Sequence, residues 1–308
     1  MSKHISVLLN EAIYYLNIKE DGVYVDATLG FAGHSSEILK RIPNGKLIAF
    51  DKDIEAVNYS KEKLSKIGNN FEILNTGFIN LKKNLEERLI KPDGVLFDLG
   101  VSSVEIDDES RGFSYMKDAP LDMRMDQNAE LDAYKVINSY SKEKLTSIFR
   151  KYGEEKHALK IANAIEEKRS IKPIATTGEL VDIIDKCYPY KEKRNTHPAK
   201  KVFQALRIEV NNELEEFEIA LRDSLDILKP GGRVVVITFH SLEDRICKNI
   251  FKEKTSENEL VKGMPNIPDE MLPDFKLITK KPIVPTSSEV EKNKRSKSAK
   301  MRVIEKIK

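Results

Sequence analysis

Apolar residues in the first hundred positions fall into short continuous runs that are separated by amphipathic stretches. Short apolar runs bounded by turn residues are typical of buried strands, and they predict strands at 23–26, 46–50, 71–74 and 95–97. The helical spacing elsewhere predicts helices at 4–18, from Gly33 to the turn at Pro43, at 54–67 and at 79–89. Strands that alternate with helices indicate a parallel sheet with right-handed crossovers.

The alternation stops at Asp98, and the next convincing strand is 233–239. About 130 residues separate the two, whereas one crossover connection needs about thirty. We therefore infer an inserted domain, whose helical spacing covers 133–153, 154–169 and 176–188, with Thr177 as the N-cap of the last helix. The expected domains are residues 1–108 with 208–308 for the sheet, and residues 109–207 for an all-helical insertion.

After the insertion the chain returns to the sheet. A helical stretch at 202–228, with a break expected near Asn211, leads into the strand at 233–239. A helix at 242–254 follows, and the patterns at 275–279 and 301–307 predict two last strands. A parallel α/β sheet finished by such a hairpin differs from the dehydrogenase architecture.

The turn after the first strand is the first candidate binding site. Gly30 and Gly33 bracket it, so a strand, a turn and a helix N-terminus would present backbone N–H groups to a ligand. Asp51 ends the next strand about twenty residues later, where an acid can hold a ribose hydroxyl. Asp98 ends the fourth strand and would face the same crevice. The alternatives are an ordinary tight turn and, for Asp98, a cap on the turn that follows.

Further side chains could face this crevice. His34 could donate a hydrogen bond to a ligand carboxylate or merely cap or pack, and Phe78 could cover an adenine ring or belong to the core. His240 lies in the segment FHSLEDR, where a substrate role is open. We reject a Ser–His–Asp triad because no G-x-S-x-G elbow is present, and predict Ser241 as an N-cap with Asp244 at N3.

Composition narrows the class of protein. Apolar residues make up 40% and charged residues 33%, and no apolar run approaches the ~20 residues that span a bilayer. The first residues lack the apolar core of a signal peptide. The chain has two cysteines, Cys187 and Cys247, far apart and without a C-x-x-C pair. We therefore expect a cytoplasmic protein with no metal site and no disulfide framework.

The net charge is only +2, yet positive charge is concentrated in two segments. Residues 186–207 hold seven Lys or Arg against one acid, and residues 280–308 hold ten against three. Solvated surface charge is one explanation, and a polyanionic partner is the other.

Several motifs together resemble the bacterial MraW/RsmH family of ribosomal RNA small-subunit methyltransferases. They are HISVLLNEA, DATLGFAGHS, DLGVSS, RGFSYMKDAPLDMRMD, YGEE, HPAKKVFQALRIEVNNELEE, LKPGGRVVVITFHSLEDR and RSKSAKMRVIE, and they run from about residue 4 to 305. The resemblance implies a class I S-adenosylmethionine-dependent methyltransferase with a Rossmann-like sheet and an inserted helical domain. It also implies N4-methylation of a cytidine in the decoding centre of 16S rRNA.

Gly30 of the glycine turn is one expected contact of S-adenosyl-L-methionine. The family's cofactor contacts, carried over residue by residue, give the others. They fall on Ala32, Gly33, His34, Asp51, Phe78, Asp98 and Glu105. Ala32 replaces a frequent glycine, which a contact through the backbone N–H would tolerate. Glu105 replaces a common glutamine, and a carboxylate cannot donate as an amide does.

Methyl transfer from a sulfonium mainly requires positioning of an unstacked base, with a polar group near N4 to take its proton. The candidates for that proton are Asp98, Ser102, Ser103 and His240. The D/N-P-P-Y/F/W motif of many exocyclic-amine methyltransferases is replaced here by Asp98-Leu99-Gly100-Val101.

The segment from Arg111 to Asp126 is expected to cover cofactor and base. In it, Arg124 would hold a phosphate or the base, oriented by Asp122 and Asp126; a structural salt-bridge hinge is the alternative. The basic segments would grip phosphates in a salt-dependent way. The substrate-binding candidates are Arg111, Asp122, Arg124, Asp126, Lys200, Lys201, Arg295 and Lys297.

Two other classes compete with this enzyme. One is a dinucleotide oxidoreductase, against which the missing G-x-G-x-x-G argues because Thr28 and Ala32 stand where glycines are usual. The other is an RNA- or protein-binding module without activity, and a methyltransferase for a different nucleic-acid amine also remains. The expected partner is 16S rRNA, in the 30S subunit, with no membrane partner and with a homodimer left open.

Overall fold

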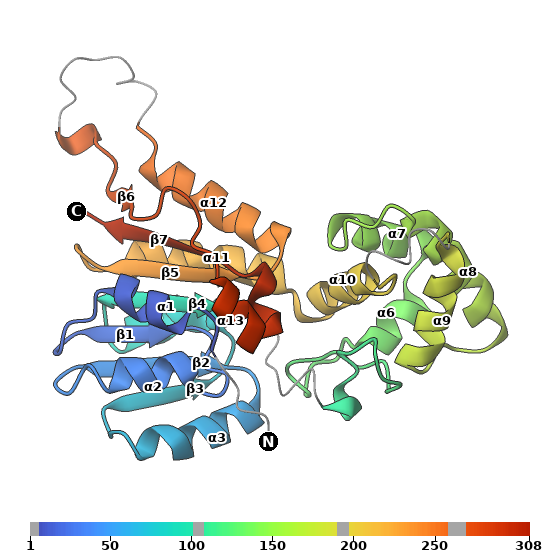
Figure 1. Ribbon diagram of the computed structural model, residues 1–308, viewed down its shortest axis with the longest axis horizontal. Helices are drawn as coiled ribbons and strands as arrows, with labels where there is room; N and C mark the ends of the chain where they lie inside the picture. Colours follow the sequence, from blue (N-terminus) through green and yellow to red (C-terminus); the bar gives the residue numbers. More distant parts are fainter. Residues whose placement is uncertain (1–5, 101–107, 190–196, 258–268) are drawn as a thin grey trace. The chain divides into compact units, whose positions relative to one another are not determined.

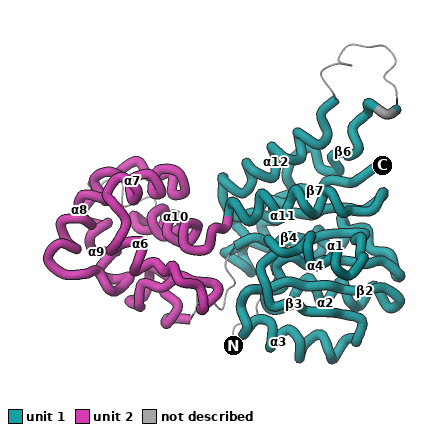
Figure 2. Tube along the Cα trace, turned by 180° about the vertical axis from the view of Figure 1, so that it is seen from behind, with its two compact units in different colours: residues 1–100, 214–308 teal, residues 101–213 magenta. Residues whose placement is uncertain are grey.

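The structure, a computed structural model, describes residues 6–100, 108–189, 197–257 and 269–308. The chain divides into two compact units, residues 1–100 with 214–308 and residues 101–213 (Figure 2). The first unit carries the sheet and the second is helical. In the described part of the chain, no helix combines the length and the apolar character needed to cross a bilayer.

Within the described residues, seven strands form one sheet in the order β3-β2-β1-β4-β5-β7-β6 (Figure 1). The strands β1 to β5 pair in parallel, and β7 runs antiparallel to both β5 and β6. The predicted parallel sheet, its terminal hairpin and the position of β4 beside β1 are therefore confirmed. The strands are β1 Val23–Asp26, β2 Lys46–Asp51, β3 Phe71–Asn75, β4 Gly94–Asp98, β5 Arg233–Thr238, β6 Phe275–Leu277 and β7 Lys300–Lys306.

Successive strand residues point to opposite faces of the sheet and build two cores. Val25 and Val95 belong to one core, whereas their neighbours Tyr24 and Leu96 belong to the other. The first core is completed by α4 Leu81–Glu87, α11 Glu213–Ile227 and α12 Ser241–Thr255. The second is completed by α1 Leu9–Leu16, α2 Gly33–Leu39 and α3 Ile54–Ser65.

The helical unit has its own core, in which Phe149, Ile161, Leu180 and Phe203 are buried. Its helices are α6 Ala133–Ser139, α7 Lys142–Lys151, α8 Ala158–Ile171, α9 Thr177–Cys187 and α10 Lys200–Asn211.

Two further short helical elements of the sheet unit lie directly before β7 in the sequence. They are α13 Ser287–Lys292 and a 3₁₀ segment, Lys294–Ser298.

Two predictions of helix limits in this unit are wrong. The stretch 133–153 forms two helices, because Ser141 accepts the Lys144 N–H at 3.2 Å as the N-cap of α7. The N-cap of α9 is Thr176, which forms a capping box with Glu179. The hydroxyl of Thr177 instead donates to the Lys117 carbonyl and accepts the Ala119 N–H, both at 2.9 Å.

Smaller differences occur in the sheet unit. The helix predicted at 79–89 starts as a 3₁₀ turn, Phe78–Asn80, and α4 ends at Glu87. The strand predicted at 275–279 is shorter and ends at Leu277. The break expected near Asn211 is confirmed, because Asn212 adopts φ 49°. Buried residues along α10, among them Val202, Leu206 and Val210, belong to the helical core, and that unit continues to residue 213, whereas 207 was expected.

Candidate active site

The glycine turn connects β1 to α2 in a left-handed conformation. Gly30 has φ +46° and Ala32, a residue with a Cβ, has φ 53° at the N-cap of α2. The Gly30 N–H donates to Asp51 Oδ2 at 2.8 Å, and the Leu29 N–H donates to the Phe50 carbonyl at 3.0 Å. The turn is thus fastened to the carboxyl end of β2, and Asp51, expected to hold a ribose hydroxyl, also holds the turn.

Helix α3 fixes the carbonyl groups of the same turn. The buried Ser60 hydroxyl donates to the Gly30 carbonyl at 2.7 Å, and Lys63 Nζ donates to the Phe31 carbonyl at 2.9 Å. The first N–H groups of a helix lack partners within the helix. The residues of α3 therefore hold the carbonyl groups of the turn. A helix N-terminus such as that of α2 favours an electron-rich ligand.

The carboxylate of Asp51 is shaped to accept hydroxyl groups. Oδ2 accepts the Gly30 N–H and Oδ1 accepts the Asp53 N–H at 2.9 Å, so each oxygen keeps a second lone pair. Burial raises the pKa of Asp51 to about 6, against the lowering effect of these two N–H groups. The side chain of Asn75 holds the strand end by donating to the carbonyls of Asp51 and Lys52.

Phe78 lies on the turn that follows β3. Its ring meets Phe97 edge-to-face at 5.9 Å, and Phe97 meets Phe217 at 5.8 Å. The Phe78 side chain is half-buried. One edge therefore joins the core, while part of the ring stays accessible for a flat apolar group such as a purine.

Asp98 at the end of β4 carries a buried acceptor. Its Oδ1 has no hydrogen-bond partner among the described residues, and its Oδ2 lies 3.4 Å from Nδ1 of His34. Its N–H donates to the Thr28 hydroxyl at 2.7 Å. Burial, followed by the charges of Asp26 and Glu243, raises the pKa of Asp98 well above its usual range. A ligand cation at Oδ1 would satisfy this acceptor.

Thr28 and Asp26 show why the turn does not need the glycines of a dinucleotide fold. The Thr28 hydroxyl joins the end of β1 to that of β4, a contact that glycine could not make. Asp26 is buried and accepts hydrogen bonds from the Ser35 hydroxyl at 2.6 Å and the Thr28 N–H at 3.1 Å. Sequence reasoning missed the roles of Thr28 and Asp26, because the motif DATLGFAGHS does not reveal which groups its side chains bond to in the fold.

His34 is buried at the start of α2. Its Nε2 lies 3.2 Å from the Val7 carbonyl oxygen, and its Nδ1 faces Asp98. Gly33 lies in close packing, since a Cβ there would lie 1.7 Å from the Ser6 hydroxyl oxygen. Residues 6–8 therefore pack directly against the glycine turn.

His240, at the end of β5, is the N-cap of α12, which corrects the prediction of Ser241 with Asp244. The Glu243 N–H donates to His240 Nδ1 at 3.4 Å, and Glu243 Oε2 accepts the Phe239 and His240 N–H groups. Asp244 instead pairs with Lys300 at 3.1 Å and Arg302 at 2.7 Å. An imidazole acceptor replaces the hydroxyl that capping statistics favour.

Hydrogen bonds within the helical unit hold the backbone of the segment 111–126. Arg111 is buried and donates to the Arg124 and Met125 carbonyls at 2.9 and 3.1 Å. Asn211, which the sequence reasoning missed, accepts the Met125 N–H and donates to the Met123 carbonyl, both at 2.8 Å. The sequence signals for Asn211 are its place in the motif HPAKKVFQALRIEVNNELEE and an amide at a helix end.

Arg124 and Asp122 form a two-point ion pair. Arg124 Nε and Nη2 donate to Asp122 at 3.0 and 2.7 Å, and Nη1 donates to the Ala129 carbonyl at 2.8 Å. Burial would raise the pKa of Asp122, but the hydrogen bonds and charge of Arg124 hold it below its usual range. Asp126, expected to orient Arg124, accepts the Asn128 N–H.

Several predicted residues are exposed, engaged elsewhere or outside the described part of the chain. Lys200, Arg295 and Lys297 are exposed, and the exposed Lys201 donates through Nζ to the Glu154 carbonyl at 2.8 Å. Arg207 is paired with Glu213 through two contacts of 2.8 Å. The residues outside the described ranges are Ser102, Ser103, Glu105, Lys191, Lys193 and Arg194.

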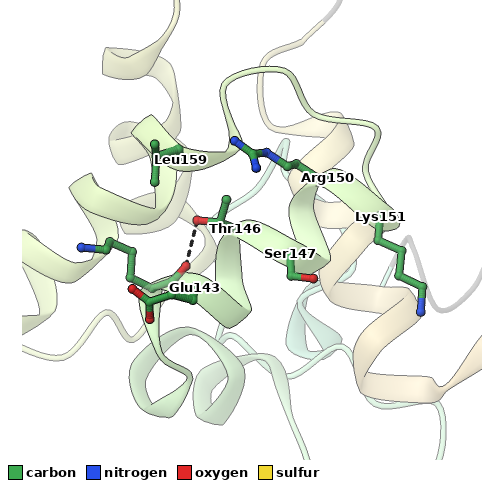
Figure 3. A pocket seen from close by; sticks show the side chains of 7 residues that line it. Glu143, Thr146, Ser147, Arg150, Lys151 and Leu159 are labelled. Carbon is green, nitrogen blue, oxygen red and sulfur yellow. Dashed lines mark hydrogen bonds between the residues drawn. The ribbon is translucent and has the colours of Figure 1, made fainter.

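The helical unit also contains a pocket of about 560 Å³ between α7 and α8 (Figure 3). Thr146 lines it, and its hydroxyl donates to the Lys142 carbonyl at 2.8 Å. Three of the lining residues are basic, and the alkyl stems of long side chains contribute much of the lining. It consists of Lys142, Glu143, Thr146, Ser147, Arg150, Lys151 and Leu159.

Comparison with solved structures finds similar chains at low identity. An rRNA methylase from Streptococcus thermophilus is 13% identical, with 97% of this chain and 94% of that chain covered and a TM-score of 0.43. NSun6 from Pyrococcus horikoshii with SFG is 12% identical, with 99% and 53% covered and a TM-score of 0.45. A SAM-dependent O-methyltransferase from Thermotoga maritima is 9% identical, with 97% and 64% covered and a TM-score of 0.41.

The family match is much more specific, because the model of the MraW methylase family covers residues 1–307. The strand order agrees with the class I methyltransferase sheet that this family implies. The site fits the cofactor, since Asp51 can accept two hydroxyls and the buried Oδ1 of Asp98 requires a donor. The chain thus belongs to the MraW methylase family and is a class I S-adenosylmethionine-dependent methyltransferase.

Proposed function

We propose that this enzyme methylates N4 of a cytidine in the decoding centre of 16S rRNA. Membership of the MraW methylase family over residues 1–307 carries the proposal. The basic segments, with exposed Lys200, Arg295 and Lys297, support a nucleic-acid substrate. The assembled 30S subunit is the proposed partner, and the cytoplasm is the proposed location.

The residues at the carboxyl edge of the sheet would hold the cofactor. Asp51 would accept the ribose hydroxyls, Phe78 would cover the adenine ring, and Oδ1 of Asp98 would accept from the ammonium group. The turn from Gly30 through Ala32 and Gly33 would contact the cofactor through its backbone. Glu105, outside the described residues, stays a proposed contact.

When bound, the cofactor supplies an electrophilic methyl group on a sulfonium, which the cytidine amine attacks. The enzyme must orient the amine and provide for the proton that N4 loses. Asp98 is one candidate acceptor, since burial raises the pKa of its carboxyl group and so makes the carboxylate a better proton acceptor. Ser102 and Ser103 remain candidates.

His240 stays a candidate for a role at the substrate. Its Nδ1 accepts the Glu243 N–H at 3.4 Å and its Nε2 lies 3.1 Å from Glu243 Oε1, so both ring nitrogens face the same glutamate. This engagement favours orienting the base over accepting the N4 proton. We assign it to holding the base or the end of β5.

The helical unit is the proposed substrate-recognition domain. The segment 111–126, fixed by Arg111 and Asn211, would present Arg124 with Asp122 to the RNA. The pocket between α7 and α8, with Lys142, Arg150 and Lys151 in its lining, offers a further place for a phosphate (Figure 3). These contacts are electrostatic and would weaken as salt rises.

The test is transfer of a labelled methyl group from S-adenosylmethionine to 30S particles that lack the modification, followed by mapping of the nucleotide and the atom. Label on cytidine N4 in the decoding centre is expected. Label on another nucleic-acid amine would replace the substrate assignment. No transfer to 30S particles or to deproteinised 16S rRNA, with intact cofactor binding, would favour a binding module and refute the enzyme proposal.

A further inference from the structure

We infer that residues 6–8 form a latch through which Glu289 of α13 positions His34 and Asp98 for cofactor binding. The inference rests on the proposed function where it concerns RNA, and on the family's cofactor alone where it concerns positioning. Glu289 would be a positioning residue, since it touches the latch and not the cofactor-binding groups.

The latch lies against the cofactor-facing turn. Ser6, Val7 and Leu8 are all buried, and the Ser6 hydroxyl occupies the space that a side chain at position 33 would need. The Val7 carbonyl oxygen lies 3.2 Å from His34 Nε2, and His34 Nδ1 lies 3.4 Å from Asp98 Oδ2. A shift of the latch would therefore move the imidazole that faces Asp98.

The latch has a strained backbone that needs outside support. Leu8 has φ 50° although it carries a branched side chain, and this left-handed conformation is disfavoured for such residues. Residues in this conformation persist when their surroundings over-determine it. Here the side chain is fully buried and the Leu8 N–H donates to Glu289 Oε1 at 2.8 Å.

Glu289 links the latch to the basic end of the chain. It lies in the first turn of α13, where its N–H donates to the Thr286 hydroxyl at 3.2 Å. The exposed Arg295 and Lys297 follow within the next 3₁₀ segment. Figure 1 shows α13 beside α1, in agreement with the hydrogen bond between Leu8 and Glu289.

This continuous set of contacts predicts coupling between two ligands. RNA that orders residues 287–298 would stabilise the Glu289–Leu8 hydrogen bond, the latch and the orientation of His34 toward Asp98. RNA should then raise the affinity for the cofactor, and the cofactor should raise the affinity for RNA by the same factor. Asp26 and Glu243 are the other charged groups that act on Asp98.

The first experiment measures cofactor binding without RNA, by calorimetric titration of S-adenosylhomocysteine into the full chain. Glu289→Ala should raise Kd about tenfold, because it removes the hydrogen bond that holds the latch in position. Glu289→Gln, which keeps an acceptor, should restore most of the affinity. Glu291→Ala, an exposed acid on the same helix, is the matched control and should bind as the unaltered chain does.

Two further readouts separate positioning from general loss of structure. Hydrogen exchange at the Leu8 amide should accelerate in Glu289→Ala while exchange in β1 and β4 stays slow. The KM for S-adenosylmethionine should rise more than kcat falls. If the alanine variant fails to fold, Glu289→Asp, which keeps the charge on a shorter side chain, replaces it.

The coupling is tested by repeating the titration with 30S particles that lack the modification. Their presence should lower Kd severalfold in the unaltered chain, and this ratio should approach one in Glu289→Ala. An unchanged Kd without RNA in Glu289→Ala, or an unchanged ratio with particles, overturns the inference even if methyl transfer proceeds. Failure of the unaltered chain to methylate the particles refutes the proposed function, whereas the measurement without RNA still decides the role of Glu289.

Discussion

Asp51 provides the sharpest test of the cofactor geometry. Its two oxygens accept the N–H groups of Gly30 and Asp53 at 2.8 and 2.9 Å and keep lone pairs for two hydroxyls. In Asp51→Asn the shape is retained, but the amide NH₂ must face one of those N–H groups. A donor then opposes a donor, and one neutral oxygen replaces the carboxylate as the acceptor for ribose.

The expected loss can be estimated from the hydrogen bonds. A hydrogen bond to a charged acceptor contributes about 1.5–3 kcal/mol, so loss of one raises Kd about tenfold to a hundredfold. Stability should change much less. The folded-state pKa of Asp51 is about 6 against 3.8 unfolded, so its ionisation costs roughly 3 kcal/mol of folding free energy at neutral pH. Asp51→Asn removes this cost, which offsets the loss of folding free energy caused by the new donor–donor contact.

The pH dependence has a definite sign. The stabilising contribution of protonated Asp51 is fully present below pH 3.8 and is lost as pH rises through about 6. Two ribose hydroxyls require the ionised form, so cofactor affinity should fall about tenfold between pH 7 and pH 5. In Asp51→Asn this slope should shrink, and the slope that remains would report Asp98.

Calorimetric titration with S-adenosylhomocysteine from pH 5 to pH 8 measures both effects, and thermal unfolding checks stability. Asp53→Asn is the matched control, because asparagine keeps the N-cap of α3 and the backbone N–H that Asp51 accepts. The reasoning would be refuted by an Asp51→Asn variant that binds within twofold of the unaltered chain with the same pH slope.

Three other predictions concern the turn, the loop and the basic end. Thr28→Val leaves the Asp98 N–H without its acceptor, so unfolding free energy should drop about 1–3 kcal/mol, whereas Thr28→Ser should retain most of it; equal melting temperatures would contradict this. Asn211→Ala frees the loop backbone, so kcat should fall while cofactor Kd stays constant; an unchanged kcat would argue against that role. Lys297→Ala should reduce the salt slope of 30S binding by about one, with cofactor Kd unchanged, and an unaltered slope would exclude a phosphate contact.

Much of the sheet could be predicted from the sequence because its signals are local. The strand β1 occupies the predicted residues 23–26, and β4 lies beside β1 as expected for a ligand crevice. Apolar runs and turn residues report burial on both faces of a parallel sheet over a few neighbouring positions. The same holds for the family motifs, which are contiguous in the chain.

The helix caps were harder to predict, because competing side chains stand next to each other. Thr176 and Thr177 are chemically identical, and contacts with residues 117–119 determine which of them caps α9. At α12 the choice of His240 depends on Glu243 reaching back to the chain before it. Local statistics cannot separate such pairs, since the deciding partner belongs to the folded structure.

The sequence by itself was enough to predict the parallel α/β sheet, the position of the glycine turn and the acidic residues that end the strands. It was also enough to identify the family. Only the tertiary structure decided that Asp98 Oδ1 is buried without a partner among the residues the structure describes, and that the Leu8 N–H donates to Glu289. The reason is physical: periodicity reflects neighbours along the chain, whereas burial, pKa and backbone strain depend on atoms that folding brings together from opposite ends of it.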